Sequence, residues 1–151
     1  MKVLDQQLAA EAVVADADLP RLKELWLIEQ AKPSPNLDVK FQYAMLLTKS
    51  SHRGNNKEGL AMLQDLVHCN YHVEECYYLM ALGLYRMQKY EDSRRHCETA
   101  LRMDPDMAVA LSLHHNIKEA IAARDTTVGA VAAAGLAVVG LAVGVAMSRR
   151  R

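Results

Sequence analysis

Four side chains that could bind a metal ion lie close together near the middle of the chain. They are His68, Cys69, His72 and Cys76, and the last two are one helical turn apart. Imidazole and thiolate are ligands of zinc, but structural zinc sites usually draw paired ligands from two separate segments. Here all four residues fall in one short stretch between apolar runs. The spacing therefore favours a turn between helices and predicts no metal site.

Catalytic motifs are missing from the sequence. It contains no glycine-rich phosphate-binding loop and no nucleophile elbow. Cys97 occupies a position where a helical repeat packs its helices, so we expect a buried rather than a reactive thiol. His114 and His115 are expected on the exposed face of a helix. The sequence predicts a protein that is not an enzyme and that needs no cofactor.

The distribution of charge argues against a nucleic-acid partner. The 151 residues carry 18 basic and 18 acidic side chains, but three of the basic ones are the last three residues. The rest of the chain is therefore slightly acidic, whereas phosphate binding requires a basic surface. An odd number of cysteines without a secretory signal favours free thiols in a reducing compartment.

An uncharged apolar stretch runs from Val128 to Met147. As a helix these residues span about 30 Å, the thickness of the hydrocarbon core of a membrane. The alternative is a buried helix of a soluble domain, but a helix that is apolar on all faces needs a larger protein around it. We predict a transmembrane tail anchor at residues 126–147, followed by a short basic tail at residues 148–151.

Two further predictions concern this segment. The positive-inside rule would keep the terminal arginines in the cytosol, but the whole folded domain would then have to be exported. We therefore expect the short tail to cross the membrane and the N-terminal domain to stay in the cytosol. Gly140 and Gly144 form a GxxxG pair, a motif of helix dimers, although a glycine-rich span contains such pairs by chance. A homo-oligomer therefore remains open.

The rest of the chain is typical of short helices separated by polar turns. Breaks are expected at residues 32–36 and 52–56, and Asp104 with Pro105 suits the start of a helix. The predicted helices span about residues 16–32, 38–50, 57–67, 73–87, 90–103 and 105–124. The predicted fold class is all-α: a tetratricopeptide-like helical bundle of about six helices with a C-terminal transmembrane helix.

Two helical hairpins resemble each other, at about residues 38–70 and 74–107. Their length fits the tetratricopeptide repeat, a helix–turn–helix unit of about 34 residues. Small residues recur where paired helices would approach each other closely. These are Ala44, Gly59, Ala81 and Ser93. A generic helical bundle is the alternative that this pattern leaves open.

Stacked repeats curve, and their first helices line the concave side. The side chains expected there are Phe41, Met45, Thr48, Lys49, Tyr78, Leu82, Tyr85 and Arg86. Aromatic rings and an arginine on such a surface are typical of a groove that binds a peptide or a partner protein. The alternative is that part of this set belongs to the core, covered by the N-terminal segment.

The N-terminal segment, residues 1–18, is predicted to be an arm or an extra helix. It is alanine-rich, with Leu4 and Leu8 on one face, and could lie in the groove. Asp16 or Asp18 is expected to cap the next helix, with Pro20 in its tolerant first turn. A cytosolic tetratricopeptide-like domain would then span residues 19–124.

The order of these features resembles the mitochondrial fission 1 protein family. The resemblance rests on Phe41-Gln-Tyr-Ala44, Lys49-Ser50, Lys57-Glu-Gly-Leu60, Tyr85-Arg86 and Tyr90-Glu91, and on the C-terminal anchor. It implies a cytosol-facing protein of the outer mitochondrial membrane, and also of the peroxisomal membrane. Such a protein brings a dynamin-related GTPase to sites of division, directly or through adaptor proteins. The chain departs from the family at Met45, where a tryptophan is favoured, and in the turn at residues 52–56.

The resemblance also bears on targeting and on the second function considered. Basic tails bias weakly apolar anchors of this family toward mitochondria, so Arg149, Arg150 and Arg151 are expected to direct targeting. The second function is a tail-anchored import or chaperone receptor that binds targeting peptides. An apolar groove would suit an amphipathic targeting helix, but Phe41 and Tyr78 disfavour a clamp for a chaperone's terminal carboxylate.

Overall fold

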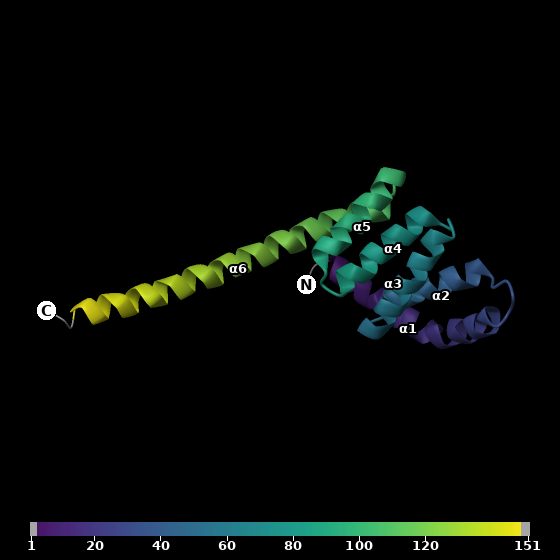
Figure 1. Ribbon diagram of the computed structural model, residues 1–151, viewed down its shortest axis with the longest axis horizontal. Helices are drawn as coiled ribbons and strands as arrows, with labels where there is room; N and C mark the ends of the chain where they lie inside the picture. Colours follow the sequence, from purple (N-terminus) through teal and green to yellow (C-terminus); the bar gives the residue numbers. More distant parts are fainter. Residues whose placement is uncertain (1–2, 149–151) are drawn as a thin grey trace. The chain divides into compact units, whose positions relative to one another are not determined.

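The computed structural model describes residues 3–148, with side chains described up to residue 131. The described chain is entirely helical (Figure 1). The helices are α1 (Val3–Gln30), α2 (Leu37–Lys49), α3 (Arg53–His68), α4 (Val73–Arg86), α5 (Tyr90–Met103) and α6 (Ala108–Ser148). The chain divides into two compact units, Met1–Ile117 and Lys118–Arg151. The prediction of an all-α fold with about six helices is confirmed.

The first helix is longer than predicted. α1 runs without a break through Asp16 and Asp18, so neither residue caps a helix, and Pro20 lies in its interior. The predicted helix start was therefore wrong. One stripe of α1 is buried on both sides of the proline, at Leu8, Ala12, Ala15, Leu19 and Leu22. Burial of this stripe offsets the roughly 3 kcal/mol that a proline costs in a helix interior.

Helices α2 and α3 form one antiparallel hairpin, α4 and α5 form the second, and α3 packs on α4. The first hairpin is closed by a glycine. A Cβ atom added at Gly59 would lie 2.9 Å from the Cβ of Leu47 and 3.0 Å from the carbonyl oxygen of Ala44. In the second hairpin the buried Ser93 hydroxyl donates to the carbonyl oxygen of Ala81 at 2.7 Å. Small residues at these contacts therefore allow the close approach of the helices.

Two helix starts differ from the prediction, and a polar side chain binds the backbone near each of them. α3 begins at Arg53 rather than near Lys57, since the buried Asn56 amide donates to the carbonyls of Leu47 and Ser50 at 3.0 Å each. α6 begins at Ala108 rather than at Pro105, since the Asp104 carboxylate accepts a bond from the Asp106 N–H and holds a turn first. The Asn56 amide thereby satisfies carbonyls that the end of α2 leaves unpaired, and Asp104 satisfies an N–H in the turn before α6.

The last helix, α6, contributes to both units. Its first turns bury Ala110, Leu113 and Ile117 in the first unit. Among the described residues, no helix combines the length and apolar character that crossing a bilayer requires. Most of the predicted anchor at residues 126–147 lies outside the described side chains, as do Gly140 and Gly144, and Arg149–Arg151 lie outside the described residues.

Candidate partner-binding groove

The eight residues expected on the concave side come from two helices that belong to different hairpins. Phe41, Met45, Thr48 and Lys49 lie on α2, and Tyr78, Leu82, Tyr85 and Arg86 lie on α4. The first unit brings α2 and α4 into contact. The eight side chains differ in their exposure, however, and much of the surface is covered by α1.

Thr48 is a packing residue between the hairpins. Its side chain is fully buried, and its hydroxyl donates to the carbonyl oxygen of Met45 at 2.8 Å. A Cβ atom added at Gly83 of α4 would lie 3.4 Å from the Thr48 methyl carbon. Thr48 therefore offers no atom to a ligand, and the expectation that it lines an open groove was wrong. Met45 and Lys49, on the same helix, are half-buried.

Phe41 belongs to an aromatic cluster at the turn before α4. Its ring stacks on His72 with centroids 5.0 Å apart and meets Tyr71 edge-on at 6.2 Å. His72 has a left-handed backbone conformation, with φ of 44°. The cluster therefore fixes the connection between the two hairpins.

The cysteine and histidine residues near this turn form no metal site in the described part of the chain, where no three metal-ligating side chains gather. The buried Cys76 thiol donates to the carbonyl oxygen of Tyr71 at 3.4 Å. Burial, with added repulsion from Glu75 and Glu74, raises the pKa of Cys76 to about 12. Because a metal ligand must be a thiolate, this environment opposes metal binding. Burial likewise raises the pKa of Cys97 to about 11.

On α4, the side chains of Leu82 and Tyr85 are buried, and Tyr78 is half-buried. The Tyr85 ring packs against Tyr90 with centroids 5.4 Å apart. Tyr78 and Leu82 line a cavity of about 70 Å³ that is also lined by α1 and the start of α6. The lining residues from these two helices include Leu4, Leu8, Glu11, Val109 and Leu113. The N-terminal arm, which we define as residues 3–15 of α1, therefore covers this part of the groove.

Arg86 contacts the N-terminal arm directly. Its Nη2 donates to the carbonyl oxygen of Leu8 at 3.0 Å, while its buried Nε has no hydrogen-bond partner. Burial lowers the pKa of the guanidinium, and the carboxylates of Glu11 and Asp16 oppose that shift. Glu11 also lies 3.9 Å from the ammonium of Lys49. Basic side chains from both groove helices thus face the arm.

Asp16, directly after the arm, is a residue that the sequence did not single out as part of the groove. Its Oδ1 accepts a hydrogen bond from the Ser50 hydroxyl at 2.5 Å, and its Oδ2 accepts one from the Ser51 hydroxyl at 2.6 Å. The Ser51 backbone N–H also donates to Oδ2, at 3.2 Å. Burial acts to raise the pKa of Asp16, but these hydrogen bonds together lower it below its usual value. Asp16 therefore fastens α1 to the turn between α2 and α3.

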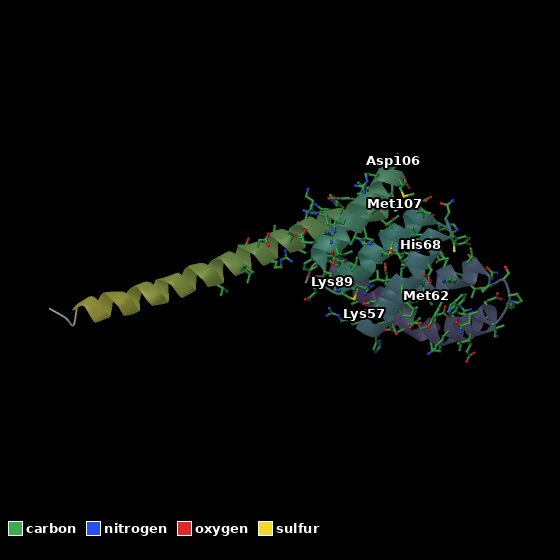
Figure 2. The ribbon with its side chains drawn as sticks, viewed as in Figure 1. Lys57, Met62, His68, Lys89, Asp106 and Met107 are labelled. Atoms are coloured by element: carbon green, nitrogen blue, oxygen red, sulfur yellow. The ribbon has the colours of Figure 1, made fainter. Side chains whose placement is uncertain are left out.

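A polar depression of about 320 Å³ lies beside this turn. It is lined by Ser50, Ser51, Arg53, Asn56, Arg86, Met87 and Gln88. Figure 2 labels Lys57 in α3 and Lys89 immediately before α5, and the turns that precede these two helices border the depression. Two arginines from different hairpins thus share one surface hollow.

The chain is similar to proteins named mitochondrial fission 1 protein. It is 31% identical over 149 residues to the one from Tuber borchii, which covers 94% of this chain and 93% of the relative. It is 30% identical over 139 residues to the one from Mycosarcoma maydis, which covers 87% of this chain and 91% of the relative. The family profile described as the Fis1 C-terminal tetratricopeptide repeat matches residues 74–125.

A solved structure shares the fold. Yeast Fis1, crystallised in complex with an Mdv1 fragment that contains an N-terminal extension and coiled coil domains, superposes with a TM-score of 0.64. Its sequence is 20% identical, and the match covers 72% of this chain and 86% of that chain. This likeness confirms the predicted tetratricopeptide-like architecture of the helical domain. From the identity and coverage of its relatives, the chain belongs to the mitochondrial fission 1 protein family.

Proposed function

We propose that this protein is an adaptor in mitochondrial fission, and that it binds a protein of the division machinery through the groove between α2 and α4. The relatives' name supports the process, and the Mdv1 fragment in the yeast Fis1 structure supports an adaptor protein as partner. In this proposal the protein recruits a dynamin-related GTPase, either directly or through such an adaptor.

One observation carries the groove as the binding surface. The surface already holds a helix, because the arm lays Leu4 and Leu8 beside Tyr78 and Leu82, and Arg86 donates to an arm carbonyl. An apolar stripe on a helix that docks in a groove, with polar contacts at its edge, is a recurring mode of peptide recognition. A partner helix that uses the same contacts would have to displace the arm. Only molecules with an undocked arm could bind the partner, so the apparent affinity for the partner would fall in proportion to their fraction.

The proposal is tested by measuring how purified dynamin-related GTPase and purified adaptor bind the full-length protein. Tyr78→Ala should weaken binding more than tenfold, because truncating a central aromatic anchor often costs about 2 kcal/mol. Tyr77→Ala is the matched control, since Tyr77 is the adjacent residue and its ring faces His96 of α5 at 6.0 Å. Deleting the arm should strengthen binding.

Equal binding by the wild type and the Tyr78→Ala variant would argue that the α4 surface is core alone. Binding of amphipathic targeting peptides in place of both division proteins would support an import receptor instead. In cells, the Tyr78→Ala variant should leave mitochondria elongated and underdivided.

We further propose that residues 126–147 anchor the protein in the outer mitochondrial membrane, with the helical domain in the cytosol and a second pool on peroxisomes. The uncharged stretch and the basic tail support this proposal. A fluorescent protein fused to residues 125–151 should coat mitochondria, and replacing Arg149–Arg151 with serine should redistribute it. Diffuse fluorescence of the first fusion would refute the anchor. We also predict that Gly140 and Gly144 form a contact between two anchor helices in a dimer.

A further inference from the structure

Two contacts fasten the N-terminal arm, and both lie at the edge of the same surface hollow. Asp16 accepts hydrogen bonds from Ser50 and Ser51, and Arg86 donates to the carbonyl of Leu8. Ser50, Ser51 and Arg86 all line the polar depression of about 320 Å³. A change of charge at this hollow would therefore act on both contacts at once.

Ser51 is the accessible hydroxyl at this place. Its side chain is exposed, whereas the neighbouring Ser50 is buried. It lies between α2 and α3 where the chain is not helical, and the flanking Ser50 and His52 have extended backbone, with ψ of 149° and 121°. Basic side chains, Lys49 and Arg53, stand on both sides of it in the sequence. A modifying enzyme can thus reach this serine without unfolding a helix.

We propose that Ser51 is a phosphorylation site, and that its phosphorylation releases the N-terminal arm from the groove. A protein kinase transfers the γ-phosphoryl group of ATP to the Ser51 Oγ. The new Oγ–P bond forms as the bond between that phosphorus and the ADP oxygen breaks, and the hydroxyl proton passes to a base of the kinase. Phosphorylation and arm release do not depend on the proposed function. Only the consequence, that a released arm uncovers a binding surface, rests on it.

The first effect of the phosphate is to remove the hydrogen bond from the Ser51 hydroxyl to Asp16. The Ser51 hydroxyl now donates to Asp16 Oδ2 at 2.6 Å, and a phosphate ester has no hydroxyl proton left to donate there. It also brings a charge of about −1.5 to −2 next to a carboxylate. The low pKa of Asp16 keeps that carboxylate ionised at neutral pH. A hydrogen bond is thereby replaced by repulsion between like charges.

The second effect is to compete for Arg86. A phosphate that turns away from Asp16 enters a hollow lined by Arg53 and Arg86, and guanidinium groups bind phosphate oxygens in pairs of hydrogen bonds. The Arg86 Nε has no hydrogen-bond partner, so it is free to donate a hydrogen bond to a phosphate oxygen. An Arg86 side chain drawn toward the phosphate loses its bond to the Leu8 carbonyl. Both contacts are then weakened, and the arm is released more readily.

The test uses full-length protein in detergent micelles, with phosphoserine incorporated at position 51 during synthesis. Hydrogen–deuterium exchange of backbone amides in residues 4–15 reports arm release without any partner. We expect exchange there to become about tenfold faster than in the unmodified protein, while α5 stays protected. Phosphoserine at position 34, an exposed serine in the turn between α1 and α2, is the matched control for added charge.

Two variants separate charge from the loss of one hydrogen bond. Ser51→Ala loses a bond but adds no charge and leaves the Ser50 bond, so its exchange in residues 4–15 should stay within about twofold of the wild type. In an Asp16→Asn background the phosphate should add much less than tenfold, because the repulsion that it exerts on the carboxylate is gone. Mass spectrometry of protein isolated from its own cells is expected to find phosphate on Ser51.

Equal exchange for phosphoserine at positions 51 and 34 would overturn the proposal. So would faster exchange throughout α3 and α5, because the phosphate would then unfold the domain rather than release the arm. Protein from dividing and non-dividing cells that never carries phosphate on Ser51 would overturn the assignment of the site. Arm release without stronger binding of the GTPase or adaptor would uphold this inference and reject the proposed function.

Discussion

Two interfaces of the helical domain differ in how completely they are packed. Between α2 and α3, Gly59 leaves no room for a methyl group, and the Asn56 amide is fully engaged with backbone carbonyls. Between the arm and α4, a cavity of about 70 Å³ remains, and the buried Arg86 Nε is unpaired. A void and an unpaired donor both lower the free energy needed to open an interface. We therefore expect the contact between the arm and α4 to open at a lower free energy than the contact between α2 and α3.

The largest expected effect comes from breaking the tighter interface. Gly59→Ala would place a methyl group 2.9 Å from the Leu47 Cβ and 3.0 Å from the Ala44 carbonyl oxygen, so the helices must move apart. We expect a loss of about 1–3 kcal/mol in the free energy of unfolding, since overpacking costs that much in a core. Thermal unfolding of the full-length protein, followed by circular dichroism, measures the change.

The control for this variant is Gly54→Ala in the same helix. Outside the local helix backbone, no atom lies within 4 Å of a Cβ at that position, so the melting temperature should stay the same or rise slightly. A melting temperature for Gly59→Ala that matches the wild type would contradict the close contact inferred for α2 and α3.

A smaller and local effect should follow from weakening the looser interface. Asp16→Asn removes the charge that accepts hydrogen bonds from Ser50 and Ser51, and turns half of the acceptor into a donor. Hydrogen exchange in residues 4–15 should become about tenfold faster, because bonds to a charged group are among the stronger ones. Exchange in α3 should not change.

Asp18→Asn is the matched control for this prediction. Asp18 lies two residues further along α1 and pairs with the exposed Arg21 at 2.7 Å, away from the turn between α2 and α3. Its loss should leave exchange in the arm unchanged, since exposed ion pairs contribute little. Similar acceleration by both variants would mean that Asp16 acts through the charge of α1 rather than through its contact.

The smallest expected effect is a dependence on pH. The pKa of Asp16 is lower in the folded protein than its usual value of 3.8, so ionised Asp16 favours the docked arm. That contribution is complete well above pH 3.8 and is lost as the pH falls through the lower, folded pKa. Methyl NMR signals of Leu8 should therefore shift toward those of a released arm below pH 3.8 in the wild type. The Asp16→Asn variant should show no such step.

The helices could be predicted because their apolar periodicity and their breaks are local properties of the sequence. The start of α3 could not, because Asn56 reads as a turn residue until its partners at Leu47 and Ser50 are known. The continuity of α1 was hidden for a similar reason. Pro20 is a local signal against a helix interior, and only burial on both sides of it, from Leu8 to Leu22, overrides that signal.

The groove was predicted in outline and not in detail. Tyr78 and Leu82 of α4 line one cavity with residues of the arm, and the sequence already left open that the N-terminal segment covers them. The inward turn of Thr48 depends on its contacts with the other hairpin at Gly83, which no pattern within α2 reveals. Asp16 was missed because the serines that it binds are 34 and 35 residues away.

Pro20 has one more consequence, for how the arm leaves. A proline has no N–H, so the Asp16 carbonyl four residues earlier receives no hydrogen bond from it. The weakest turn of α1 therefore lies directly after the arm and at the residue that fastens it. We expect the arm to open as one cooperative unit that ends at this turn, while Leu19 and Leu22 stay packed. The proline thereby sets the boundary of a local unfolding step. Only the arm, which a partner has to displace, then gains conformational entropy when it opens.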